Sequence, residues 1–213
     1  MRTVYVIGDS TVENGSDPYY GWGGQLAEYL PGVKVDNHAF SGRSSKSFWD
    51  EKRFEPVAAD MRQGDLLLVC FGHNDEKDDE ERHTDPTTTY PEMLMRYVSA
   101  ARAAGAVPVL CTSVSRNFFA GNGFLLYTHG EYPHAVRALC EKETVALIDL
   151  ETMTRELMKA LGEQKSCELF VNIAPGTDER FPNGVADRTH YNLYGAKRVA
   201  ELVAEQLKKS GLA

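Results

Sequence analysis

Five short runs of apolar residues have the length and composition of β-strands. Residues 65–71 (DLLLVCF) are almost continuously apolar, which is typical of a central strand that is covered on both faces. Residues 3–7 (TVYVI) form a second run that stops at a glycine, and residues 33–39 alternate weakly between apolar and polar positions. The last two runs are residues 107–113 (VPVLCTS) and 145–150 (VALIDL). The pattern therefore predicts five strands.

Stretches with helical spacing separate these runs. Residues 91–104 begin with a proline in the first turn and end before a glycine, and residues 193–209 are long and amphipathic. Further helices are predicted at residues 23–30, 54–61, 132–144 and 151–161. Strands that alternate with helices predict an α/β fold with a parallel sheet. We expect a three-layer α/β/α sandwich whose five strands follow the flavodoxin-like order 2-1-3-4-5.

Three longer polar segments, residues 76–90, 115–131 and 171–188, interrupt this alternation, and we expect them to be irregular. They lie on the carboxyl side of the predicted sheet, where open α/β folds bind their ligands. The charged run at residues 75–82 is typical of a solvated loop rather than of a metal site. Because no repeat, linker or low-complexity tract is present, we predict one domain over residues 1–213.

Composition and charge exclude some classes of partner. The formal net charge of -8 and the pI near 5.3 argue against a nucleic-acid partner, because phosphate binding needs clustered Lys and Arg. The first ten residues lack the apolar stretch of a signal peptide, and no later run is long enough to cross a membrane. These features predict a cytoplasmic protein without a membrane partner, and they do not indicate an oligomeric state.

The cysteines show no metal-ligand spacing and no disulfide framework. Three of the four lie within apolar segments, and a cytosolic chain keeps its thiols reduced. We therefore predict reduced thiols, mostly in the core, at Cys70, Cys111, Cys140 and Cys167.

Polar residues that are able to take part in catalysis follow the first two predicted strands. Ser10 comes directly after a Gly-Asp pair, and a serine at the end of a strand becomes a nucleophile when a base takes its proton. The alternative is that Ser10 or Thr11 only caps a turn. Gly42 offers an unobstructed backbone N–H to a developing oxyanion, although the segment taken alone favours an ordinary turn in which Ser44 caps a helix.

Two further positions complete a possible catalytic set. Asn74 follows the third predicted strand, where its amide can serve as an oxyanion donor or can simply close an Asx-turn. Asp187 precedes His190 by three residues, so its carboxylate can bond the Nδ1–H of His190 and leave Nε2 free to act as a base. Each of these features is modest alone. Together they supply a nucleophile, a base, an orienting acid and oxyanion donors.

In this combination the sequence resembles the SGNH (GDSL-like) hydrolase family. Its four sequence blocks are matched in order over nearly the whole chain, by Gly8-Asp9-Ser10, by Gly42, by Gly72-His73-Asn74-Asp75, and by Asp187 with His190. The stretches GDST, NHAFSGRSSKSF, FGHND and DRTHYNLYGA are similar to the rhamnogalacturonan acetylesterase branch of that family.

The resemblance implies a role for each matched residue. Ser10 would attack an ester carbonyl, His190 would be the general base and then the acid, and Asp187 would orient the imidazole. The backbone N–H groups of Ser10 and Gly42, with the side chain of Asn74, would form the oxyanion hole. No metal and no organic cofactor is implied.

The resemblance also implies the substrate, an acetylated oligosaccharide derived from rhamnogalacturonan, from which acetyl groups would be removed. Arg43 and Arg188 flank the predicted site and are expected to meet galacturonate carboxylates, and Tyr191 is expected to contact the sugar. Other aromatic side chains offer a stacking face to a sugar or serve as packing residues, and the sequence leaves both roles open for Trp22, Trp49, Phe118 and Phe119.

The same residues leave three other functions to weigh against an acetylesterase. A thioesterase, lipase-like acyl hydrolase or acyltransferase would use the same triad, but the polar loops disfavour a large apolar pocket. A metallophosphoesterase is a weaker alternative, because the order of His73 and Asn74 is reversed and the other metal-binding motifs are missing. A binding module with a decayed site is not supported, since every catalytic residue type is present.

Overall fold

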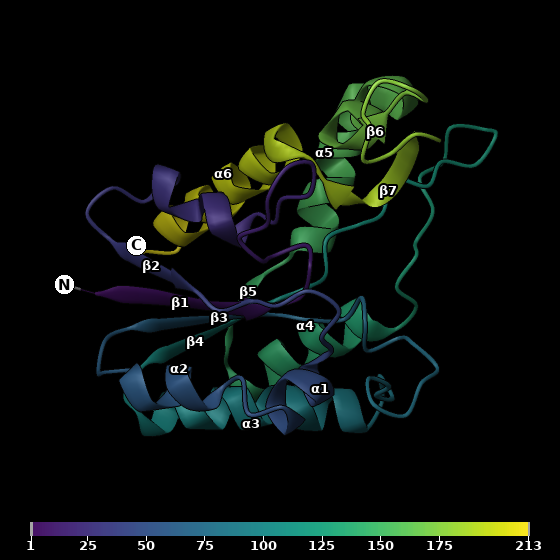
Figure 1. The fold of residues 1–213 in the computed structure, drawn as a ribbon. Helices are drawn as coiled ribbons and strands as arrows, with labels where there is room; N and C mark the ends of the chain where they lie inside the picture. Colours follow the sequence, from purple (N-terminus) through teal and green to yellow (C-terminus); the bar gives the residue numbers. More distant parts are fainter. Residues whose placement is uncertain (1, 213) are drawn as a thin grey trace.

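A five-stranded sheet forms the middle layer of the computed structural model, which describes residues 2–212 (Figure 1). All neighbouring strands are parallel, and their order across the sheet is β2-β1-β3-β4-β5. The predicted direction and order of the five strands of this sheet are therefore confirmed. The strands are β1 (Thr3–Gly8), β2 (Lys34–Asn37), β3 (Leu66–Cys70), β4 (Val107–Cys111) and β5 (Ala146–Ile148).

Helices cover both faces of this sheet and give the predicted three-layer arrangement (Figure 1). One face carries the 3₁₀-helix η1 (Gly23–Tyr29) and the long helices α5 (Leu150–Ser166) and α6 (Leu193–Lys209). The opposite face carries α1 (Ser45–Asp50), α2 (Glu55–Asp60), α3 (Thr89–Ala103) and α4 (Tyr132–Glu143). The described chain begins and ends near the amino-terminal edge of the sheet (Figure 1). Because all five strands are parallel, their carboxyl ends lie together at the opposite edge.

The central strands are apolar throughout because they contribute to two separate cores. In β3, Leu66 and Leu68 pack in the core shared with α6, whereas Leu67 and Val69 pack in the core shared with α3. Successive side chains of a strand point to opposite faces, so both sets become fully buried. Each such side chain stabilises the fold by about 1.5–3 kcal/mol relative to an exposed one. These buried rows hold the loops at the strand ends in fixed positions.

The structure departs from the sequence prediction after α5. The short 3₁₀-helix η2 (Cys167–Leu169) leads into an antiparallel pair of strands, β6 (Phe170–Ile173) and β7 (Val185–Tyr191). We expected residues 171–188 to be irregular, and this prediction was wrong at both ends of the segment. The strands are short and are separated by a turn region rich in proline and glycine, which hid their periodicity.

Between β2 and α2 the structure has a helix that the hydrophobic pattern did not predict, the six-residue α1. Ser44 caps this helix, as expected for the turn that follows Gly42. The Ser44 side chain accepts a bond from the backbone N–H of Ser47, and the Ser47 hydroxyl bonds back to the N–H of Ser44. This capping box satisfies two free donors at the helix start and fixes the chain direction after Gly42.

The cysteines are reduced, as predicted. All four cysteines are free, and Cys70, Cys111 and Cys140 are buried. Within residues 2–212, no helix combines the length and the apolar character that are needed to cross a bilayer.

Candidate active site

The turn after β1 presents Ser10 at the carboxyl edge of the sheet. The backbone N–H groups of Val12 and Glu13 both donate to the carbonyl of Asp9 at 3.0 Å, so the chain turns immediately after the strand. The buried carboxylate of Asp9 accepts bonds from the N–H of Thr11 at 2.9 Å and from its hydroxyl at 2.8 Å. Burial raises the pKa of Asp9 to about 6. Asp9 thus anchors the turn, and the Ser10 hydroxyl is left half-buried at its surface.

The fold brings His190 to this serine across 180 residues of sequence. The Oγ of Ser10 lies 3.1 Å from Nε2 of His190, and Nδ1 of His190 lies 2.9 Å from Oδ2 of Asp187. His190 sits near the end of β7 rather than in a loop. The bond to Asp187 raises the pKa of His190, although burial acts in the opposite direction. A neutral His190 with its proton on Nδ1 can accept the Ser10 proton at Nε2.

The carboxylate of Asp187 is held by three donors. Its Oδ1 accepts the backbone N–H of Thr189 at 2.7 Å and that of His190 at 2.9 Å, while Oδ2 faces the imidazole. Burial alone would raise the pKa of Asp187, but the bonds from His190 and Thr189 outweigh it and lower the pKa to about 2. Asp187 is therefore ionised at neutral pH and fixes both the ring orientation and the tautomer of His190.

Hydrogen bonds link the segments that carry the three candidate oxyanion donors, Ser10, Gly42 and Asn74. The loop that carries Gly42 is tied to the end of β1 by the N–H of Phe40, which donates to the carbonyl of Gly8 at 3.0 Å. Nδ2 of Asn74 donates to the carbonyl of Arg43 at 3.1 Å, which leaves its second hydrogen free. Within residues 2–212, no protein atom accepts a bond from the backbone N–H of Ser10 or Gly42.

Gly42 needs its lack of a side chain for conformation rather than for space. Its φ is +77°, a region that side-chain-bearing residues rarely adopt, and a Cβ built there would meet no atom within 4 Å. The N–H of Gly42 therefore belongs to a left-handed turn that glycine adopts without strain.

The two flanking arginines differ in how they are engaged. Arg43 forms an ion pair through Nε with both carboxylate oxygens of Glu51, at 3.1 and 3.0 Å, and its Nη1 donates to the carbonyl of Ser41. Arg188 is exposed, lies 5.7 Å from the ring centroid of Phe118, and has no ion-pair partner within residues 2–212. Nη1 of Arg188 donates to the carbonyl of Asn117 at 3.5 Å, so of these two arginines Arg188 is the one without a carboxylate partner among the described residues.

The expected sugar contact of Tyr191 is wrong. Its side chain is 1% exposed and stacks on Phe170 with the ring centroids 5.0 Å apart. Because Tyr191 follows His190 in a strand, its side chain points to the opposite face, into the core. Sequence reasoning missed Tyr19, whose ring meets that of His190 edge-on at 5.8 Å. No periodic signal marks Tyr19, since it lies in the irregular segment after Ser10.

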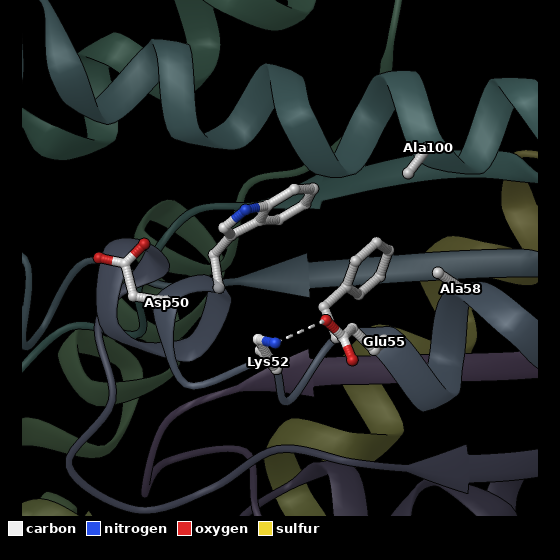
Figure 2. Close-up of a pocket in the computed structure, with 7 residues that line it drawn as sticks. Asp50, Lys52, Glu55, Ala58 and Ala100 are labelled. Carbon is white, nitrogen blue, oxygen red and sulfur yellow. Dashed lines mark ion pairs between the residues drawn. The ribbon is translucent and has the colours of Figure 1, made fainter.

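The other aromatic candidates fall into different environments. Trp22 is completely buried in the core, and Phe119 is partly buried against it, whereas Phe118 is 39% exposed. Trp49 stacks on Phe54 at 5.6 Å and lines a groove of about 390 Å³ between α1, α2 and α3 (Figure 2). No triad residue lines this groove, so Trp49 serves packing rather than the site around Ser10.

A two-metal enzyme needs several carboxylates and imidazoles that converge on one site. Across the described residues 2–212, no group of three or more His, Cys, Asp or Glu side chains is arranged to hold a metal ion. His73, the imidazole of the motif that suggested a phosphoesterase, bonds instead to the buried His129.

Comparisons with known proteins identify the family of this chain. The GDSL-like lipase/acylhydrolase family matches residues 6–198. Rhamnogalacturonan acetylesterase RhgT of Bacillus subtilis is 42% identical over 98% of this chain and 90% of its own length. Probable rhamnogalacturonan acetylesterase YesY of the same organism is 37% identical over 98% of this chain and 94% of its own.

A solved structure extends the comparison to three dimensions. The crystal structure of the protein YxiM of Bacillus subtilis superposes with a TM-score of 0.85 at 26% identity. It covers 100% of this chain, which spans 57% of that longer one. The order of the sequence blocks, the strand order and the matched family agree over nearly the whole length, and the chain belongs to the GDSL-like lipase/acylhydrolase family.

Proposed function

We propose that this protein is a serine esterase that removes acetyl groups from carbohydrate, with oligosaccharides derived from rhamnogalacturonan as its substrates. The observation that carries the proposal is the chain of short contacts from Ser10 through His190 to Asp187. The relatives RhgT and YesY are named as a rhamnogalacturonan acetylesterase and a probable one, which supports acetyl as the group removed and rhamnogalacturonan as the source of the sugar. Residues 1–213 would act as one hydrolase domain.

Acylation begins when Ser10 gives its proton to Nε2 of His190 and its Oγ attacks the acetyl carbonyl carbon. The negative charge that develops on the carbonyl oxygen is held by the N–H groups of Ser10 and Gly42 and by the amide of Asn74. When the intermediate collapses, the bond from the carbonyl carbon to the sugar oxygen breaks, and His190 returns the proton to that oxygen. The sugar leaves with a free hydroxyl, and Ser10 carries the acetyl group.

Deacylation repeats these steps with water in place of serine. His190 takes a proton from the water, whose oxygen attacks the acetyl carbon, and the same donors hold the second oxyanion. Breaking the bond to Oγ releases acetic acid, which ionises in solution, and returns the proton to Ser10. Asp187 remains a carboxylate throughout and stabilises the imidazolium form of His190 in both halves.

Arg188 would select acidic oligosaccharides. Its guanidinium is exposed one residue from Asp187 and lies beside Phe118, so a galacturonate carboxylate can bind the cation while the sugar ring meets an aromatic face. Arg43 shares the carboxylate of Glu51 with Arg53, and its Nη1 also donates to the carbonyl of Ser41. Arg43 would therefore hold the Gly42 loop instead of binding substrate.

The decisive experiment measures acetate released from acetylated rhamnogalacturonan oligosaccharides, with acetylated xylan fragments and a butyryl ester in parallel. Ser10→Ala should abolish release, whereas Ser99→Ala, an exposed serine on α3, should leave it unchanged. EDTA should have no effect on the wild type. Equal activity on the butyryl ester would favour a broad acyl hydrolase, and activity that survives Ser10→Ala would contradict the mechanism.

A further inference from the structure

Two histidines that play no part in the triad form a buried pair beside the oxyanion site. His73 is 5% exposed and His129 is 1% exposed, and Nε2 of His129 lies 2.8 Å from Nδ1 of His73. The rings meet edge-to-face at 4.3 Å. Burial and the nearby Arg116 lower the pKa of His129 to about 3, and burial also lowers that of His73 well below its usual range. Both imidazoles are therefore neutral, and one N–H is shared between them.

The chain on either side of His129 holds the same loop through two further contacts. The hydroxyl of Tyr132 donates to the carbonyl of Asp75 at 2.9 Å. Arg116 pairs with Glu76 and also donates to the carbonyl of Thr128 at 2.9 Å. Residues 128–132 thus contact the loop at positions 73 and 75 directly, and they reach position 76 through Arg116. We call residues 128–132 together with Arg116 the brace.

Asn74 lies at the centre of this braced loop without touching the brace through its own side chain. Its amide donates to Arg43 on the opposite side, so its position is set by how firmly the backbone of residues 73 and 75 is held. An oxyanion donor acts only when it is held within about 0.5 Å of its productive position. The two neighbours of Asn74 are the residues that the brace fixes.

We propose that His129, through its bond to His73, is a positioning residue that holds Asn74 in the oxyanion hole. The inference rests on the proposed function, because it requires Asn74 to bind the oxyanion. It gives the 115–131 segment a task in catalysis apart from binding sugar. It also explains why a histidine stands before Asn74, where an apolar residue would fill the same buried volume without making a directional bond.

The expected kinetic signature is a loss of kcat with little change in KM. The oxyanion is present in the tetrahedral intermediates of acylation and deacylation and develops in the transition states that lead to them, so a misplaced Asn74 leaves the ground-state complex intact. Complete loss of one oxyanion donor costs roughly 10²–10³ in kcat. Misplacement should cost part of this, so we expect His129→Leu to lower kcat about 10–50-fold.

The test is a double-mutant cycle of His129→Leu and Asn74→Ala, measured on 4-nitrophenyl acetate. If His129 acts through Asn74, its replacement should lower kcat less than about twofold once Asn74 is alanine, because coupled residues are not additive. His129→Gln, which can still bond His73, should stay within about threefold of the wild type. His134→Leu, an exposed histidine on the adjoining α4, is the matched control and should behave as wild type.

Additive losses in the cycle, or a loss that appears mainly in KM, would overturn the proposal. If His129→Leu does not fold, as judged by its thermal melt, Tyr132→Phe replaces it in the cycle, since this change removes only the hydroxyl that bonds to the carbonyls of Asp75 and Thr84. The small ester needs no sugar site, so a failure on carbohydrate leaves the test valid. Unchanged hydrolysis after Ser10→Ala or Asn74→Ala would instead overturn the proposed function.

Discussion

Replacing Asp187 by asparagine exchanges one oxygen for an amide nitrogen and reverses the hydrogen bond to His190. Two backbone donors, from Thr189 and His190, converge on Oδ1 of Asp187, so the amide oxygen of the variant should take that place. The amide nitrogen then faces Nδ1 of His190 and donates to it. His190 must carry its proton on Nε2, where it points at Ser10 and cannot accept the serine proton.

The size of the effect follows from this geometry. In serine hydrolases with the same Ser-His-Asp triad, the wrong histidine tautomer lowers kcat about 10⁴-fold, which corresponds to roughly 5.5 kcal/mol of activation free energy. A second effect concerns pH. The bond to Asp187 raises the pKa of His190, so the wild-type enzyme gains its neutral base only as the pH rises through that raised value. Without the carboxylate, burial lowers the pKa, and the acid limb of the profile should move to lower pH.

The assay is kcat/KM for 4-nitrophenyl acetate and for an acetylated oligosaccharide between pH 5 and 9. Asp178→Asn is the matched control, because Asp178 is also ion-paired and has a lowered pKa, but its partner is Arg180. We expect the control to match the wild type. Retention of more than about a tenth of the wild-type kcat by Asp187→Asn would refute the tautomer argument. So would an acid limb that stays in place or moves to higher pH.

Four further outcomes follow from single residues. Arg188→Gln should raise KM for an acidic acetylated oligosaccharide roughly tenfold, the worth of one charge-assisted bond of about 1.5 kcal/mol, and should leave KM for a neutral ester unchanged. Arg43→Gln should not discriminate between the two substrates, and a selective loss would reassign the carboxylate site. Gly72→Ala should lower the free energy of unfolding in urea by about 2–5 kcal/mol, because φ is +138° and the new Cβ would lie 2.2 Å from Oγ of Ser113. Tyr191→Phe should leave both KM values unchanged and lower the free energy of unfolding by no more than about 0.5 kcal/mol, and a raised KM on oligosaccharide would restore Tyr191 to the site.

The central strands of the sheet were predictable because they are buried almost throughout. β3 is buried on both faces, so a nearly continuous apolar run leaves few other interpretations. The pair β6 and β7 has no such signal. Most of its residues are partly buried or exposed, and the connection between the two strands is rich in turn residues. Partial burial alone does not decide the outcome, because the edge strands β2 and β5 are also mostly partly buried and were predicted from short apolar or alternating runs. In β6 and β7 partial burial is combined with a connection rich in turn residues, and the pattern is lost.

The site was only partly predictable for a related reason. Ser10, Asn74 and His190 stand at the ends or beginnings of elements and within motifs, so their position along the chain carries information. Tyr19 and His129 come from irregular segments, and they reach the site only through the tertiary fold. Tyr191 was assigned to the site because its strand was not foreseen, and a strand sends adjacent side chains to opposite faces.

The buried groups around the site explain why acid should inactivate the enzyme before it unfolds it. Asp9 and Asp75 have pKa values raised to about 6, so the folded state gains protons there as the pH falls, and stability rises down to the unfolded value near 3.8. His73 and His129 have lowered pKa values, so the unfolded chain gains protons below about 6.5 and stability falls. Two groups of each kind oppose one another between about pH 4 and 6, and their joint effect on stability is small. His190 is protonated over the same range, because its pKa is raised, and it is then no longer a base. We therefore expect the acid limb to report titration at the site, with His190 as the base that is lost, and not unfolding. Thermal melts at the same pH values should show a folded protein throughout that limb, and melts that show unfolding within it would contradict this expectation.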